Sequence, residues 1–171
     1  MNEIVFHSAV LILPLIISNV MHMLIVKHNY FNFLNIPINS RSFGRNKTYR
    51  GFVVLLLING VLLYFSNFIF NTYLSYPFGI GAILGLTYMI FELPNSWIKR
   101  RLGIAPGEKH KRFEIGFKLI DKMDSAFGVV LIYWIMGFVD PAMALFLFLI
   151  SSFTHILFSQ LLYLLKIKKS F

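Results

Sequence analysis

The 171-residue chain contains no cysteine, and only 13% of its residues are charged. The absence of cysteine excludes disulfide bridges, thiolate zinc sites and a cysteine nucleophile, and it leaves the redox compartment undetermined. Soluble domains carry about a quarter charged residues, so an ordinary water-soluble enzyme is also excluded. The length predicts one membrane domain and leaves no room for a sizeable soluble domain.

Apolar residues take the place of the missing charge. They make up 57% of the chain, with 19 Phe, and the mean hydropathy is +0.71. Soluble domains average about 45–50% apolar residues. One compact core in water cannot hold such an excess, so lipid must be the solvent for much of the surface. The composition therefore predicts an integral membrane protein.

Five apolar stretches approach the length of a membrane-spanning helix. Hydrocarbon about 30 Å thick needs about 20 mostly apolar residues per helix, and the stretches lie at residues 4–26, 51–70, 77–97, 125–139 and 141–165. Pro77 and Pro141 suit the first turn of a helix, where the missing N–H costs nothing. We therefore expect a single all-α membrane domain over residues 1–171 with five transmembrane helices. The first stretch lacks a preceding basic region and is expected to be a retained anchor.

The basic residues predict the topology. All 16 Lys and Arg fall within residues 27–50, residues 99–124 and the tail cations Lys166, Lys168 and Lys169. With five spans these segments share one side, which the positive-inside rule makes the cytoplasm. We therefore expect the N-terminus outside and the C-terminus inside. Attraction to anionic lipid accounts for the rest of the net charge of +9, so no nucleic-acid partner is expected.

An acid pair, Asp121 and Asp124, precedes the short fourth stretch. At i and i+3 both carboxylates project from one helix face. Like charges at a membrane interface repel and lose hydration unless a cation joins them. Carboxylates suit Mg²⁺, which substrate phosphates usually complete. The alternative is a solvated helix start, with acids favoured by the helix dipole and Lys118 and Lys122 as neighbours.

The third stretch ends in a stripe of polar residues. Glu92, Ser96, Lys99 and Arg100 fall on one helical face, and Arg101 follows. Glu92 lies inside an apolar span, where an ionisable group is costly and is a functional candidate by default. The alternative is that Glu92 only pairs with a cation from another helix, while the basic residues anchor the span.

Two further features lie outside these stripes. Gly44 and Gly51 flank a run of cationic and hydroxyl residues suited to wrapping an anionic group, but the P-loop pattern is absent. His155, in the fifth stretch, either faces an inward cavity or bonds a backbone carbonyl. Acids for a metal, cations for phosphates and a membrane-level location together indicate that a water-soluble polyphosphate meets a lipid phosphate.

The motifs resemble those of a known family. Ser96-x-x-Lys99-Arg100, followed by Asp121-Lys122-Met123-Asp124-Ser125, resembles the two halves of the phosphatidate cytidylyltransferase (CDP-diacylglycerol synthase) pattern. The runs from Gly44 to Gly51 and from Lys99 to Gly107 are similar to motifs of its small branch that contains CDP-archaeol synthase. Glu92 stands where that branch usually has Asp, and Lys122 replaces an Arg. The lipid therefore stays open between archaeol phosphate and phosphatidate.

The resemblance implies a five-helix enzyme that joins CTP to a lipid phosphate, uses Mg²⁺ and releases pyrophosphate on the cytoplasmic side. It implies catalytic roles for Asp121, Asp124 and Lys99, and a metal set of Asp121, Asp124 and Glu92. It assigns substrate contacts to Lys47, Thr48, Arg50, Ser96, Arg100 and Arg101. The sequence also allows a homodimer. Two rival functions stay open: a CTP-dependent lipid-alcohol kinase and a non-catalytic membrane protein that binds anionic lipid.

Overall fold

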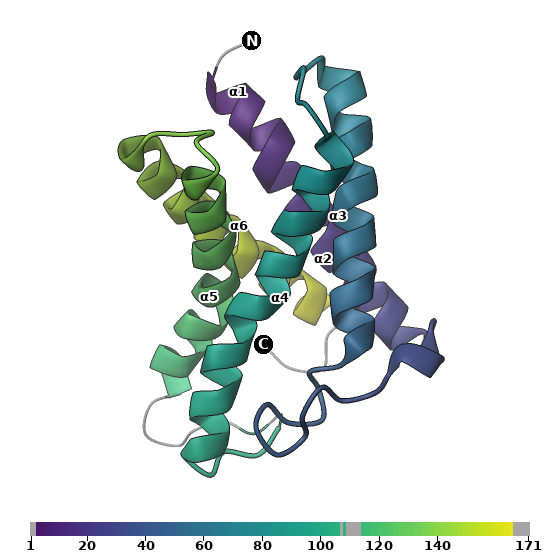
Figure 1. Ribbon diagram of the computed structural model, residues 1–171. Coiled ribbons are helices and arrows are strands. Elements are labelled where there is room, and N and C mark those ends of the chain that lie inside the picture. The colour runs from purple at the N-terminus through teal and green to yellow at the C-terminus, as the bar shows by residue number, and fades with distance from the viewer. Residues whose placement is uncertain (1–2, 107, 109–113, 166–171) are drawn as a thin grey trace.

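The computed structural model describes residues 3–106, 108 and 114–165, and their regular elements are helical (Figure 1). The tail cations from Lys166 onward, and residues 107 and 109–113 of the second basic segment, lie outside the described residues. The elements are α1 (Glu3–His7), the π-helical turn η1 (Ser8–Ile12), α2 (Leu13–Lys27), the 3₁₀ turn η2 (Asn32–Leu34), α3 (Tyr49–Phe70), α4 (Pro77–Arg101), α5 (Glu114–Ile135) and α6 (Pro141–Leu164).

Four helical segments of the described chain are long and apolar enough to cross a membrane. They are Glu3–Lys27, Tyr49–Phe70, Pro77–Arg101 and Pro141–Leu164. The prediction of an all-α protein with several apolar helices is confirmed. The stretch expected at 125–139 differs, because α5 begins at Glu114 and ends at Ile135. The first half of α5, up to Asp124, contains five charged residues, so α5 is not among the four helices apolar enough to cross a membrane. The fifth span therefore stays a prediction.

The first predicted span is one continuous helical segment, in which the π-helical turn η1 lies between α1 and α2. Pro14, in the first turn of α2, has no N–H to donate. Just before it, the N–H of Leu13 donates to the carbonyl of Ser8, five residues back. The hydroxyl of Ser66 on α3 donates to the carbonyl of Ala9 at 2.7 Å. A neighbouring helix thus bonds a backbone carbonyl of the irregular turn.

Helices α3 and α4 run side by side, and glycines on α4 bring their backbones together (Figure 1). A Cβ atom on Gly81 would lie 2.4 Å from the carbonyl oxygen of Asn59, and one on Gly85 would lie 2.3 Å from that of Leu55. No Cβ fits at such distances. Small residues permit this close approach between membrane helices, where packing replaces the hydrophobic drive. The contact fixes where the C-terminal end of α4 lies.

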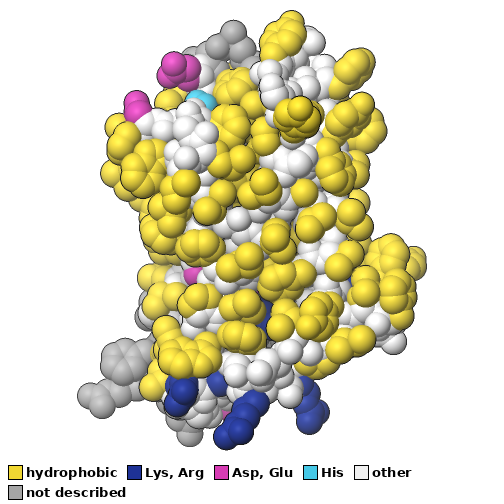
Figure 2. Space-filling model, in the orientation of Figure 1, with side chains coloured by type: hydrophobic (Ala, Val, Ile, Leu, Met, Phe, Trp, Pro, Cys, Tyr) yellow, Lys and Arg dark blue, Asp and Glu magenta, His cyan; other side chains and the backbone are white. Residues whose placement is uncertain are grey.

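Apolar side chains occupy both the interior and the outer surface of the bundle. Leu11, Leu55 and Tyr133 are fully buried in the core, whereas Phe68 is 79% exposed and Phe153 is 62% exposed. Figure 2 shows hydrophobic side chains over most of the visible surface, with Lys and Arg gathered at one end. That end carries the loop after α2 and the C-terminal end of α4 (Figure 1). Charge is thus separated along the long axis of the protein.

Gly85→Ala is expected to destabilise the protein by about 1–3 kcal/mol, as overpacking does, because the new methyl group would press on the Leu55 carbonyl. The measurement is thermal unfolding in detergent, followed by circular dichroism. Gly79→Ala is the matched control on the same helix, because its Cβ would meet nothing nearer than 4.0 Å. Equal melting temperatures for the two variants would contradict the close α3–α4 contact.

Candidate active site

The loop between α2 and α3 folds back against the end of α4. At its base, the N–H of Ile38 donates to the carbonyl of Lys47 at 3.0 Å, within a short antiparallel pairing. At its tip, Gly44 has φ +85°, a conformation that favours glycine. A Cβ on Gly44 would lie 2.9 Å from Cγ of Pro106 and 3.7 Å from Cζ of Arg100. The glycine-flanked loop therefore lies against the basic end of α4.

The acid pair of α5 meets α4 through two side chains. The ammonium group of Lys99 donates to both carboxylate oxygens of Asp121. The amide Nδ2 of Asn95 donates to Asp121 and also to Oδ2 of Asp124, the latter at 3.1 Å. Asp124 further accepts the N–H of Ser125 at 2.7 Å. The structure thus brings together Asp121, Asp124 and Lys99, the residues expected to be catalytic.

Two residues of α6 form hydrogen bonds with Lys122, which follows Asp121 on α5. Lys122, only 5% exposed, donates to the hydroxyl of Ser159. Nδ1 of His155 lies 2.8 Å from the carbonyl oxygen of Lys122, and a carbonyl only accepts, so this nitrogen carries a proton. Nε2 of His155 lies 3.1 Å from the hydroxyl of Tyr88. The backbone-carbonyl contact predicted as one alternative for His155 is present in the structure.

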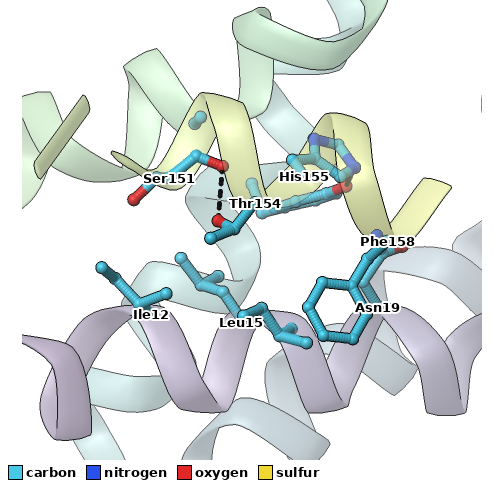
Figure 3. A pocket seen from close by; sticks show the side chains of 10 residues that line it. Ile12, Leu15, Asn19, Ser151, Thr154, His155 and Phe158 are labelled. Carbon is cyan, nitrogen blue, oxygen red and sulfur yellow. Dashed lines mark hydrogen bonds between the residues drawn. The ribbon is translucent and has the colours of Figure 1, made fainter. Parts of the chain in front are cut away.

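His155 also borders a small, mostly apolar pocket inside the bundle. Figure 3 shows Ser151, Thr154 and His155 of α6 opposite Ile12 and Leu15, with Phe158 and Asn19 at one end. The pocket lining is completed by residues that include Tyr88 and Ala126. The histidine thus separates an apolar space from the acid-bearing turn of α5.

Glu92 forms a different contact from the one that the metal set requires. Its carboxylate is ion-paired with Lys47 of the loop, and both side chains are less than one-fifth exposed. The hydroxyl of Ser96 donates to the backbone carbonyl of Glu92 at 2.9 Å. Among the described residues, no three His, Asp or Glu side chains are grouped to hold a metal ion. In this structure Glu92 ties the loop to α4 through Lys47, and its place in the metal set with Asp121 and Asp124 stays a prediction.

Two adjoining basic pockets lie where the loop meets α4, with volumes of about 630 Å³ and about 550 Å³. Arg41 and Arg100 line both of them. Nε and Nη1 of Arg100 are buried and have no hydrogen-bond partner in the described part of the chain. Arg101 lines the larger pocket and lies over the ring of Trp97 at 5.0 Å. Buried donors that lack an acceptor are costly, so these pockets are suited to an anion such as a phosphate.

Of the six residues expected to bind substrate, four do not line the basic pockets: Lys47, Thr48, Arg50 and Ser96. Thr48 is 7% exposed at the start of α3, and Arg50 is 5% exposed. Nη1 of Arg50 donates to the carbonyl of Tyr30 at 3.3 Å, which braces the turn before the loop.

Sequence reasoning missed Arg41 and Asn95. Arg41 lies in a loop whose fold no motif specified. Asn95 did carry a signal, because it stands one helical turn before Lys99 on the stripe that includes Glu92. A neutral amide on this stripe is a weaker signal of function than its ionisable neighbours Glu92 and Lys99.

The donor atoms at the acid pair fit a divalent cation. Mg²⁺ is usually held by one or two carboxylates together with substrate phosphates and water. Asp121 and Asp124 both contact the side-chain amide of Asn95 on α4. The basic pockets are lined by residues further along the same helix, including Arg100. Two carboxylates at the same end of α4 as the basic pockets supply the protein ligands for such a cation.

These features define a class: a helical membrane protein in which an acid pair and basic, anion-suited pockets lie at the same end of the bundle. The model of the CarS-like CDP-archaeol synthase family matches residues 1–171, and the chain belongs to this family. The chain is accordingly a CTP-dependent cytidylyltransferase, a transferase of lipid biosynthesis. The family resemblance of its sequence motifs is confirmed.

Three curated relatives are all named CDP-archaeol synthase. That of Staphylothermus marinus is 31% identical over 89% of this chain and 84% of its own length. That of Methanopyrus kandleri is 30% identical over 75% of this chain and 70% of its own length. That of Pyrococcus furiosus is 36% identical over 39% of this chain and 41% of its own length. No solved structure matches the chain.

Glu92→Gln is expected to lower stability by about 3 kcal/mol, because breaking a buried ion pair leaves Lys47 without its counter-charge. Thermal unfolding in detergent measures the loss. Glu108→Gln, at an exposed acid outside the bundle interior, is the matched control and should change little. The double variant Lys47→Met/Glu92→Leu should recover stability, since it removes both charges. A double variant no more stable than Glu92→Gln would contradict the pairing.

Proposed function

We propose that the protein transfers the cytidylyl group of CTP to a lipid phosphate, giving a CDP-lipid and pyrophosphate. The observation that carries the proposal is the Lys99–Asp121 ion pair, which sets the acid pair of α5 beside the basic end of α4. Relatives named CDP-archaeol synthase support the same reaction with archaeol phosphate. Phosphatidate, with the same phosphate on ester-linked chains, is the second candidate substrate.

The proposed reaction needs positioned charge more than covalent help. An oxygen of the lipid phosphate attacks the α-phosphorus of CTP, a new P–O bond forms, and the bond from that phosphorus to the bridging oxygen breaks. Pyrophosphate carries the electron pair away. Such transfers depend on orientation and electrostatic stabilisation. A chain without cysteine can therefore perform this reaction, because no protein nucleophile is required.

We assign the binding of the triphosphate to the basic pockets. Arg41, Arg100 and Arg101 line them, and the bare N–H groups of Arg100 are suited to phosphate oxygens. Lys47, held by Glu92, brings one more cation from the loop to α4. In this proposal these cations neutralise charge on the leaving pyrophosphate.

Asp121 and Asp124 are the residues that we propose to hold Mg²⁺, which when bound would neutralise charge on the triphosphate. In the structure, Lys99 donates to both oxygens of Asp121. Its ammonium group orients that carboxylate. A lysine on a flexible stem can then turn to a phosphate oxygen when CTP arrives.

We further propose that α5 is the fifth span, with the N-terminus outside and the polar site facing the cytoplasm. Helix α5 has 22 residues, about 33 Å at 1.5 Å per residue, and it contacts both α4 and α6. The gathering of Lys and Arg at one end (Figure 2) supports this orientation through the positive-inside rule.

The absence of cysteine makes the orientation directly testable. Arg45→Cys places one thiol in the loop at the basic end, and Asp140→Cys places one before α6. In intact cells, a membrane-impermeant maleimide is expected to label the Asp140→Cys variant and not the Arg45→Cys variant. Permeabilised cells provide the control, because both thiols should then react. Labelling of Arg45→Cys in intact cells would contradict the orientation.

Asp124→Asn is expected to lower CDP-lipid formation by at least ~10²-fold, because the proposed cation site loses a charged ligand. The assay incubates purified protein with Mg²⁺, archaeol phosphate or phosphatidate, and CTP labelled on the α- or γ-phosphate. Asp140→Asn is the matched control, because it changes an aspartate that only caps α6. Label in the lipid from the α-phosphate supports the proposal. Label from the γ-phosphate would indicate a kinase, and no label a lipid-binding protein.

A further inference from the structure

We propose that Asn95 is a third ligand of the divalent cation, with its amide oxygen completing the site that Asp121 and Asp124 begin. The inference rests on the proposed function, since it concerns the cation of that same site. It adds a neutral ligand from α4 to the two carboxylates from α5. The cation would then join the two helices directly.

The position of Asn95 carries the inference. Its side chain is 6% exposed, and its Nδ2 atom contacts an oxygen of Asp121 at 2.5 Å and an oxygen of Asp124 at 3.1 Å. A single amide thus stands against both members of the acid pair. Lys99, one helical turn later, reaches only Asp121, and Glu92, one turn earlier, pairs with Lys47.

The two distances lie on either side of the separation between neighbouring ligands of a small cation. Mg²⁺ binds oxygen at about 2.0–2.1 Å in octahedral geometry, which sets adjacent ligand atoms about 2.9 Å apart. The amide atom of Asn95 lies 2.5 Å and 3.1 Å from the two carboxylate oxygens. Atoms at such separations can take neighbouring positions around one cation, which leaves its remaining positions for water and phosphate.

The amide can switch from donor to ligand while its side chain keeps the same outline. The nitrogen and oxygen of an asparagine side chain are nearly equal in size, and a half-turn about the terminal bond exchanges them. Without a cation, the N–H groups of Asn95 point at Asp121 and Asp124 and relieve their repulsion. With a cation bound, the oxygen takes that place, since a carbonyl oxygen suits Mg²⁺ and Mn²⁺.

A purely structural role for Asn95 predicts the opposite effect on affinity. If its N–H groups only bridge the carboxylates, they compete with the cation, and their removal should leave cation binding unchanged or tighter. If its oxygen is a ligand, the removal should weaken binding. The sign of the change therefore separates the two roles.

The experiment measures Mn²⁺ binding to the purified full chain in detergent, without CTP, from the electron paramagnetic resonance signal of free Mn²⁺. Asn95→Leu should weaken binding about 10-fold or more, the scale seen when supporting groups of metal sites are lost. Asn95→Asp, which keeps an oxygen ligand, should bind Mn²⁺ at least as tightly as the unaltered protein. Asn19→Leu is the matched control, because it replaces an equally buried amide, 7% exposed, outside the acid cluster.

Unchanged or tighter Mn²⁺ binding in Asn95→Leu overturns the inference. If Asn95→Leu does not fold, Asn95→Ala carries the same test with a smaller side chain. Asp124→Asn separates this failure from that of the proposed function. If Asp124→Asn loses Mn²⁺ while Asn95→Leu keeps it, the acid pair remains the cation site and only the role of Asn95 is rejected. If the unaltered protein binds no Mn²⁺, both are rejected.

Discussion

The site depends on one contact, in which Lys99 and Asn95 of α4 hold the carboxylates of α5. Carboxylates packed against apolar helices lose part of their hydration, which is unfavourable unless donors replace the lost water. An ammonium group and an amide on the neighbouring helix supply those donors. Helix α5 can therefore carry Asp121 and Asp124 against the bundle, and the first half of α5 stays helical beside α4.

The rest of the bundle supports that contact. The glycines of α4 let it pack closely on α3, while His155 and Ser159 of α6 bond the residue between the two aspartates. The loop after α2 approaches the same end of α4 and is tied there by the Lys47–Glu92 pair. Three parts of the chain that are distant in sequence thus converge at one end of α4, where the basic pockets lie.

Much of this arrangement could be predicted from the sequence, and the errors have physical causes. The apolar stretches at 51–70 and 141–165 correspond closely to α3 and α6, because length and hydropathy are local properties. The start of α5 at Glu114 was not predicted, since its first half is polar and only contact with α4 makes it part of the bundle. The pairing of Glu92 with Lys47 could not be predicted, because helical spacing gives a face but not the side chain that meets it.

The sequence by itself determined the membrane class, the grouping of the basic residues into three segments and the family motifs, since each follows from composition or from short spacings. Only the tertiary structure decided which charges pair. It set Glu92 on Lys47 and Asp121 on Lys99, turned Arg50 inward to Tyr30, and brought Asn95 between the two aspartates. The physical reason is that an ion pair depends on the relative rotation and height of two helices, which packing fixes and no single segment encodes.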